Sequence, residues 1–298
     1  MIPAILLNYI MVVTALLSAS CIITLSSSNF GSIIGELTTY GKVNQHTHRR
    51  LTKWIAVPKR WFRHFYIVAM LSVSACLYLG YEFTTGARKS AHFFPYLRML
   101  TSKSPQTSFN VGMVVLGMQL LHVTRRMIET QFISVYSSTE MNIFHYVMGI
   151  VHYIILPLSV VCETLGFAST SVYKLALPDL TTKQMFGVIL FVFANYEQFK
   201  VAKTLAAVRK NGGQVDASGH AICHGGLFDQ ISCPHFLLEI LIYFGLFLVL
   251  PSGVVAYKYM MYFVVVNQFF AAQITHRWYK SNFKDYPPQR KAIIPYLF

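Results

Sequence analysis

The sequence predicts an all-α membrane protein, a bundle of seven transmembrane helices with a lumenal N-terminus and a cytosolic C-terminus. Hydrophobic residues make up 54% of the 298 residues and charged residues only 12%, whereas a soluble domain carries roughly 25% charged residues. The net charge of +14 would suggest a nucleic-acid partner in a soluble protein, but in a membrane protein it marks cytosolic loops. We therefore expect a protein that contacts membrane lipid and binds no nucleic acid.

Seven apolar stretches account for the predicted helices, because a helix of about 20 mostly apolar residues crosses a bilayer. The first stretch lacks the basic lead-in of a secretory signal, so we expect it to be retained as a helix. Only residues 251–258 separate the last two stretches. The seven are residues 2–25, 65–81, 109–123, 143–167, 185–196, 236–256 and 257–275.

The distribution of basic residues sets the predicted orientation. With the N-terminus outside the cytosol, the cytosolic segments hold 18 of the 25 Lys and Arg residues and leave 7 for the other side. This bias follows the positive-inside rule and requires an odd number of spans. No internal repeat or change of composition divides the chain, so residues 1–298 are expected to form a single integral membrane domain.

A carboxylate within an apolar stretch is costly and is usually paired or functional. His235, Glu239 and Tyr243 recur every four residues, which places them on one face of a helix that begins near Pro234. One interpretation is a His-Glu pair that links helices of the bundle. The other is a polar lining that binds a ligand and fixes its tautomers.

Two segments that contain basic residues can likewise be interpreted either as structural or as ligand-binding. Arg125 and Glu129 have the i, i+4 spacing of an ion pair, which is a sufficient structural role for both. A second series suits the phosphates of a nucleotide and consists of Asn195, Tyr196, Glu197, Gln198, Lys200, Lys203, Arg209 and Lys210. Snorkelling of long side chains and the positive-inside rule account for the same residues equally well.

Several other chemistries lack their motifs. The five cysteines are odd in number and contain no CxxC pair, which argues against a disulfide framework. The sequence has no GxGxxG, Walker, GxSxG or HExxH motif, so a Rossmann cofactor domain is not expected. Cys223, His224, Cys233 and His235 lack the spacing of a zinc site, and we expect no metal.

The C-terminal tail resembles that of a known family. Residues 276–298, His-Arg-Trp-Tyr-x-x-x-Phe-x-Asp-Tyr-Pro-x-x-Arg-Lys-Ala-Ile-Ile-Pro-Tyr-Leu-Phe, resemble the closing signature of the steroid 5-alpha-reductase family. Residues 225–239 resemble its second signature and residues 126–132 its third-span motif. Residues 57–66 and 232–235 are closer to the polyprenal reductase branch than to the steroid branch. The C-terminal signature spans 198–298.

This resemblance implies a multi-pass enzyme of the endoplasmic reticulum that uses NADPH to reduce an alkene conjugated to a carbonyl. In the polyprenal reductase branch the substrate is a long-chain polyprenal, and the reaction serves dolichol biosynthesis and protein N-glycosylation. Hydride addition places negative charge on the aldehyde oxygen, so a proton donor must lie there. By resemblance, the cofactor-binding residues are Arg126, Gln198, Arg209, His235, Glu239, Tyr279 and Arg290.

The candidate proton donors are His64, Tyr66, His122 and His276. His276 is the tail histidine that the family needs for activity. Where the steroid enzymes have a tyrosine that donates to the steroid carbonyl, this chain has Val123, with His122 beside it. The competing functions are reduction of 3-oxo-4-ene steroids or trans-2-enoyl-CoA thioesters, and, outside enzymes, a seven-helix receptor or transporter. The sequence leaves the oligomeric state open.

Overall fold

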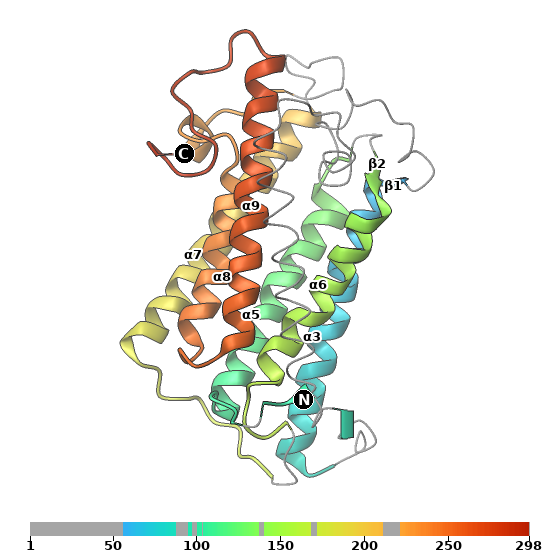
Figure 1. Ribbon diagram of the computed structural model, residues 1–298, viewed down its shortest axis with the longest axis vertical. Coiled ribbons are helices and arrows are strands. Elements are labelled where there is room, and N and C mark those ends of the chain that lie inside the picture. The colour runs from blue at the N-terminus through green and yellow to red at the C-terminus, as the bar shows by residue number, and fades with distance from the viewer. Residues whose placement is uncertain are drawn as a thin grey trace.

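The computed structural model describes residues 56–87, 95–96, 100–102, 104–136, 140–167, 172–210 and 221–297. These residues are mostly helical, and their long helices lie side by side in a bundle (Figure 1). The six α-helices in the described ranges are α3 (Phe62–Thr85), α5 (Phe109–Ile128), α6 (Ile143–Val161), α7 (Thr182–Lys210), α8 (Pro234–Val249) and α9 (Val255–Asn282). Each contains or largely overlaps one predicted apolar stretch. The first predicted stretch, residues 2–25, lies outside the described residues.

The helix boundaries correct three of the predicted stretches. The predicted helix over 143–167 stops at Val161, and the helix predicted over 185–196 extends in both directions to Thr182–Lys210. The division between the last two helices falls earlier than expected, with α8 ending at Val249 and α9 starting at Val255. Pro251 and Gly253 lie in this gap, and a proline there has no backbone N–H with which to continue α8.

Local sequence signals explain where several helices begin. The Ser108 hydroxyl accepts a hydrogen bond from the Val111 backbone N–H at the start of α5. The Asn142 side chain accepts one from Phe144 N, 2.8 Å away, at the start of α6. These side chains satisfy backbone donors that have no partner inside the helix. Pro234 occupies the first turn of α8, where its fixed φ favours helix.

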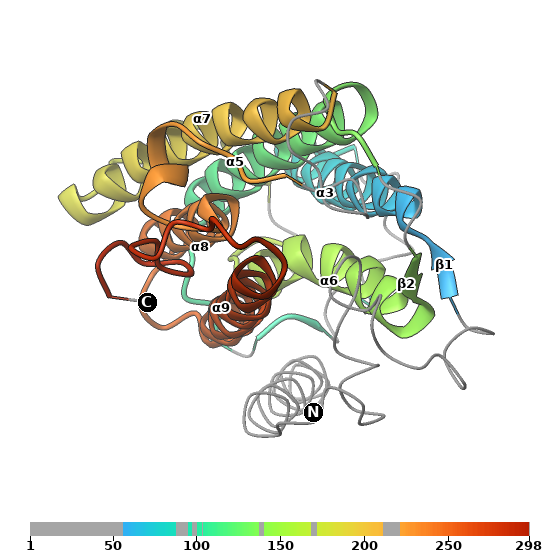
Figure 2. The ribbon, with the colours of Figure 1, turned by 90° about the horizontal axis from the view of Figure 1, so that it is seen from above.

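The bundle has two rows of helices when it is viewed from above (Figure 2). α3, α5 and α7 lie on one side, and α6, α8 and α9 lie on the other. α7 and α8 approach closely at Gly187 and Gly245, because a Cβ atom on Gly187 would lie only 2.7 Å from the Gly245 carbonyl oxygen. A two-stranded antiparallel sheet of β1 (Ala56–Pro58) and β2 (Glu140–Asn142) ties the start of α3 to the start of α6.

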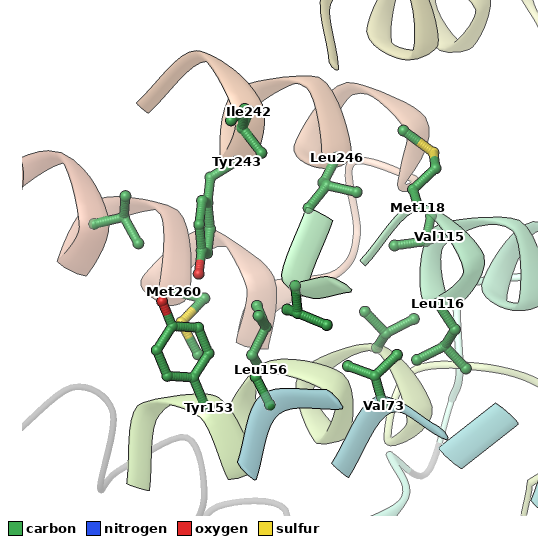
Figure 3. Close-up of a cluster of buried hydrophobic side chains, with 14 of the residues drawn as sticks. Val73, Val115, Leu116, Met118, Tyr153, Leu156, Ile242, Tyr243, Leu246 and Met260 are labelled. Carbon is green, nitrogen blue, oxygen red and sulfur yellow. The ribbon is translucent and has the colours of Figure 1, made fainter. Parts of the chain in front are cut away.

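The apolar core lies between the two rows. Figure 3 shows side chains of α3, α5, α6, α8 and α9 that point toward one another there. Val73, Leu116, Leu156, Leu246 and Met260 are each at most 2% exposed. Their mutual burial is the main favourable contribution to packing in water, and in lipid it supplies close van der Waals contact.

Two described helices are long and apolar enough to cross a bilayer, one over Lys59–Thr85 and one over Ile143–Val161. α8 is apolar but shorter, at 16 residues. The other described helices, α5, α7 and α9, carry many of the polar side chains that form the site below, and α3, α6 and α8 contribute others. The seven-helix count and the orientation of the termini therefore stay predictions.

Candidate functional site

The alternating directions of the helices gather the predicted site residues at one end of the bundle. α3, α6 and α8 begin at the upper end in Figure 1, whereas α5, α7 and α9 finish there. All eleven predicted residues lie in the half of the bundle toward that end or in the tail folded over it. They are His64, Tyr66, His122, Arg126, Gln198, Arg209, His235, Glu239, His276, Tyr279 and Arg290.

Glu129 is the centre of a buried ion-pair group. Its side chain is 0% exposed, and its two carboxylate oxygens accept hydrogen bonds from Arg125 and Arg126. The predicted Arg125–Glu129 pair is therefore confirmed. Glu129 begins a short π-helix, Glu129–Ile133, directly after α5, and π-helical turns inside membrane or enzyme helices are frequent at functional sites.

Arg125 connects this group to α7. Its Nε donates to Asn195 Oδ1 at 3.0 Å, and its Nη2 donates to Gln198 Oε1. Gln198 in turn donates through Nε2 to Glu239 Oε2 at 2.7 Å and to the His235 carbonyl oxygen at 3.0 Å. Side chains of α5, α7 and α8 thus form one continuous network.

The histidine beside Glu239 is His122. The Nε2 atom of His122 lies 3.5 Å from Glu239 Oε1, and its Nδ1 atom lies 3.1 Å from Asn195 Oδ1. The sequence interpretation of a His235–Glu239 pair is wrong in this respect: the His235 ring packs on Phe236, with centroids 4.0 Å apart. Residues four apart share a helix face, but the side chain that reaches Glu239 comes from another helix.

Tyr66 meets the network from α3. Arg126 Nε donates to the Tyr66 hydroxyl at 3.0 Å, and the guanidinium carbon lies 4.9 Å from the ring centroid. Tyr66 is 2% exposed, and its ring packs on that of Tyr153 of α6, with centroids 5.2 Å apart. Because the hydroxyl accepts the bond from Arg126, it keeps its own proton to donate to another group.

Tyr153 and His152 were not predicted from the sequence as site residues, and Asn195 was predicted only as part of a series suited to phosphates. Tyr153 contacts Tyr66, His152 Nε2 lies 3.0 Å from the Tyr243 hydroxyl, and Asn195 binds both His122 and Arg125. All three are polar residues within predicted apolar stretches, which is the signal that would have found them.

A second polar cluster lies where the tail folds back onto the start of α8. Residue Ile231 pairs with Lys291 as a parallel bridge. Ser232 Oγ lies 2.6 Å from His276 Nδ1 and also contacts the Tyr286 hydroxyl. The Tyr286 ring stacks on Tyr279, with centroids 5.3 Å apart and an interplanar angle of 13°. Partial burial and the charges of Lys280 and Lys291 lower the pKa of His276 below its usual value of 6.5.

Arg290 is the buried cation of this tail cluster. It is 3% exposed; its Nη1 donates to the Cys223 carbonyl at 2.9 Å, and its Nη2 lies 3.1 Å from His224 Nδ1. Its Nε is buried and has no hydrogen-bond partner among the described residues. A buried donor without a partner costs free energy, and a bound acceptor would remove that cost.

The four candidate proton donors do not converge. Tyr66 and His122 belong to the buried network, whereas His276 is held in the tail cluster. His64 is exposed, and its Nδ1 lies 2.9 Å from the Tyr146 hydroxyl. Arg209, a predicted cofactor residue, is also exposed, and donates to the Val135 carbonyl.

Comparison with known proteins agrees with the resemblance in the sequence. The model of the family described as 3-oxo-5-alpha-steroid 4-dehydrogenase matches residues 139–298. A Caenorhabditis elegans protein named polyprenal reductase is 41% identical over 298 residues, covering 97% of this chain and 95% of the relative. The chain belongs to the family described as 3-oxo-5-alpha-steroid 4-dehydrogenase. Polyprenal reductases of Danio rerio and Drosophila melanogaster are each 31% identical, covering 89% and 83% of this chain and 87% and 78% of the relatives.

The residues that match the family model include only part of the site. The tail cluster and the α7 and α8 residues of the network lie within the matched residues 139–298. Tyr66, His122 and Arg126 precede them, but the alignment with the Caenorhabditis elegans relative covers 97% of this chain. The 3-oxo-5-alpha-steroid 4-dehydrogenase family members are oxidoreductases, and this chain is accordingly an oxidoreductase.

Proposed function

We propose that this chain is a polyprenal reductase, which uses NADPH to saturate the α,β double bond of a long-chain polyprenal. The observation that carries the proposal is the Arg126–Tyr66 contact of 3.0 Å in the buried interior. It provides an acid beside a fixed positive charge, which is what hydride addition to a conjugated aldehyde requires. The similarity to relatives named polyprenal reductase supports this choice of acceptor.

The donor set fits a phosphate-bearing nicotinamide cofactor. Arg290 has a buried Nε without a partner among the described residues, and Arg126, Arg209, Gln198 and Tyr279 add guanidinium, amide and aromatic groups. Guanidinium forks match phosphate oxygens, and aromatic rings stack on bases. His235 and Glu239 complete the proposed contact set at the start of α8. When bound, the cofactor supplies a hydride to the β carbon of the acceptor.

Tyr66 is the proton donor that the geometry favours. His64 is exposed, His276 is engaged with Ser232 in the tail, and His122 faces Glu239. The Tyr66 hydroxyl instead accepts from Arg126 Nε, so its own proton is directed elsewhere. The Tyr66 hydroxyl donates its proton to the aldehyde oxygen when the β carbon receives hydride, and Arg126 stabilises the phenolate that remains. The α carbon of the resulting enol then takes a proton from solvent while the enol oxygen returns its proton to Tyr66, which gives the saturated aldehyde.

The membrane setting follows from the acceptor. Each CH₂ group of a polyprenyl chain costs about 0.8 kcal/mol to keep in water, so the acceptor is met in lipid. The outer face of α7 suits lipid, because Phe186, Ile189 and Phe193 are 54–64% exposed. We place the polar end of the bundle in the cytosol and the whole chain, as one domain, in the endoplasmic reticulum. The saturated product then feeds dolichol synthesis and N-glycosylation.

A steroid acceptor is the second candidate, because the matching family is described by a 3-oxo-steroid activity. Both acceptors present a carbonyl conjugated to an alkene, and the same acid serves either. They differ in shape, since a steroid is a rigid ring system and a polyprenyl chain is flexible. Measuring the activity with a polyprenal, a 3-oxo-4-ene steroid and a trans-2-enoyl-CoA thioester distinguishes these acceptors.

The decisive assay uses detergent-purified full chain with NADPH and a defined polyprenal. We expect NADPH oxidation matched by formation of the saturated aldehyde, and a much lower kcat/KM for a 3-oxo-4-ene steroid. In cells that lack the protein, we expect polyprenol to accumulate and the chain to restore dolichol. Absence of polyprenal turnover with active steroid reduction would replace the proposal by the steroid candidate. Absence of NADPH oxidation with every acceptor would favour a receptor or transporter.

A further inference from the structure

We propose that Lys59, Arg63 and Arg209 form a phosphate-binding site at the polar end of the bundle. The proposal rests on the proposed function in that we assign the phosphate to the reductant, at its 2′-phosphate group. Lys59 and Arg63 are outside the residues that the family resemblance assigns to the cofactor. We refer to these three residues as the cation triad.

Two members of the cation triad are held by adjacent residues of one segment. Arg209 Nη1, from the end of α7, donates to the Val135 carbonyl at 2.6 Å. The Arg63 guanidinium, from the first turn of α3, lies 5.1 Å from the ring centroid of Tyr136. Two guanidinium groups from helices far apart in sequence therefore converge on residues 135–136.

The third member is fixed by the small sheet. Lys59 directly follows β1, in which Pro58 pairs with Glu140 of β2. The sheet thus holds the start of η3 (Lys59–Trp61) beside Glu140 of β2, four positions after Tyr136 in the sequence. Lys59 is close enough to Arg209 for the two charges to repel each other.

The positive charge of the cation triad is not compensated by described carboxylates. None of the ion pairs within the described ranges includes these three residues. Glu129, from the turn that precedes Val135, already forms ion pairs with Arg125 and Arg126. Arg63 Nε is buried and has no hydrogen-bond partner in the described part of the chain. Lys59 and Arg209, which repel each other, and the unpartnered Nε of Arg63 together favour an anion at this place.

The position of Arg209 connects the cation triad to the proposed cofactor residues. Arg209 lines a small hollow together with Tyr279, Cys223 and Leu205. Tyr279 stacks on Tyr286 in the tail cluster, and Arg290 binds the Cys223 carbonyl. A dinucleotide bound along this end would therefore bring one phosphate to the tail cluster and another to the cation triad.

The kinetic test compares three single variants of the full chain. We expect Lys59→Met and Arg63→Gln to raise the KM for NADPH by about 10- to 100-fold, the range for one charged hydrogen bond. The kcat and the kinetics with NADH should change little, because NADH lacks the 2′-phosphate. Arg60→Gln is the matched control, since Arg60 is an exposed neighbour outside the triad. KM values equal to that of Arg60→Gln in both triad variants would overturn the proposal.

A binding measurement is independent of turnover. We expect 2′,5′-ADP to raise the Tm of the wild-type protein at constant ionic strength, 5′-AMP to raise it less, and Lys59→Met and Arg63→Gln to lose most of the difference. A shift that is equal in wild type and both variants would contradict the site. If polyprenal is not reduced but the variants lose the shift, the cation triad stands and the acceptor assignment fails.

Activity measured in nanodiscs distinguishes a lipid phosphate from the phosphate of the reductant as the ligand of the cation triad. If the triad binds the reductant, activity and the effect of the variants should be the same with zwitterionic and anionic lipids. A wild-type protein that needs phosphatidate for activity, with triad variants that do not respond to it and keep a normal KM for NADPH, would overturn the assignment to the reductant.

Discussion

Gln198 Nε2 lies 2.7 Å from Glu239 Oε2, and this hydrogen bond joins α7 to α8 inside the buried polar network. The carbonyl oxygen of the same amide accepts from Arg125 of α5. One amide therefore satisfies a carboxylate and a guanidinium at once, which neither a carboxylate nor an ammonium at this position could do. Together with His122 of α5, which lies 3.5 Å from Glu239 Oε1, it links α8 to the row of helices that contains α5 and α7.

Replacing Gln198 tests this connection. Gln198→Leu should remove one buried hydrogen bond from Glu239 and one from Arg125 and lower the Tm by several degrees, consistent with a loss of about 1.5–3 kcal/mol for a charged hydrogen bond. Gln198→Asn, which retains an amide on a shorter side chain, should lose less. Thermal unfolding of the detergent-purified variants measures both, and equal Tm values for Leu and Asn would contradict the role of the amide.

Tyr66→Phe tests the proton donor. The variant keeps the ring packed against Arg126 but removes the hydroxyl, so we expect kcat to fall by about 10²- to 10⁴-fold with NADPH affinity nearly unchanged. Tyr78→Phe is a control on the same helix, at the opposite end, where Tyr78 is 48% exposed. Steady-state turnover of polyprenal with both variants decides; normal turnover in Tyr66→Phe would exclude Tyr66 as the acid.

His276 gives the tail cluster a dependence on pH. Because its pKa is lowered by burial, Lys280 and Lys291, the unfolded chain binds the proton more readily than the folded chain. The stabilisation is complete above pH 6.5 and is lost as the pH falls through the lowered pKa. The Tm of wild type should drop between pH 7 and pH 5 by more than that of His276→Gln. Parallel pH profiles would show that His276 does not contribute.

His276 should also matter for activity. Its Nδ1 lies 2.6 Å from Ser232 Oγ, which holds α9 against the start of α8. His276→Ala should abolish turnover while far-UV circular dichroism stays that of a folded helical bundle. Near-normal activity would remove this histidine from the mechanism. Ser281→Ala is a control, because Ser281 is exposed and bonds only its own helix at Arg277 among the described residues.

Arg290→Lys tests whether shape or charge matters in the tail cluster. Lysine keeps the charge but cannot reach the Cys223 carbonyl and His224 together, as the guanidinium does. We expect the KM for NADPH to rise by about 10-fold or more with a smaller change in kcat. Lys284→Arg, at an exposed position of the tail, should leave both constants unchanged. An unaltered KM in Arg290→Lys would reduce the role of Arg290 to charge alone.

Particular residues show where sequence reasoning succeeded. The Arg125–Glu129 ion pair and the helix that begins at Pro234 depend on contacts or signals within a few residues, and both were predicted. The partner of Glu239 was not, because His122 reaches it from α5, more than a hundred positions away in the chain. Periodicity identifies the face of a helix that is buried, but it does not identify which helix covers that face.

The amino-acid sequence alone determined the helical class, the approximate location of six described helices and the family, because apolar runs and signature residues are local properties of the chain. Only the tertiary structure decided which ionisable groups meet: Tyr66 with Arg126, His122 with Glu239 and Ser232 with His276. These pairs depend on the relative positions of packed helices, and such positions are set by the fit of many side chains together rather than by any one segment.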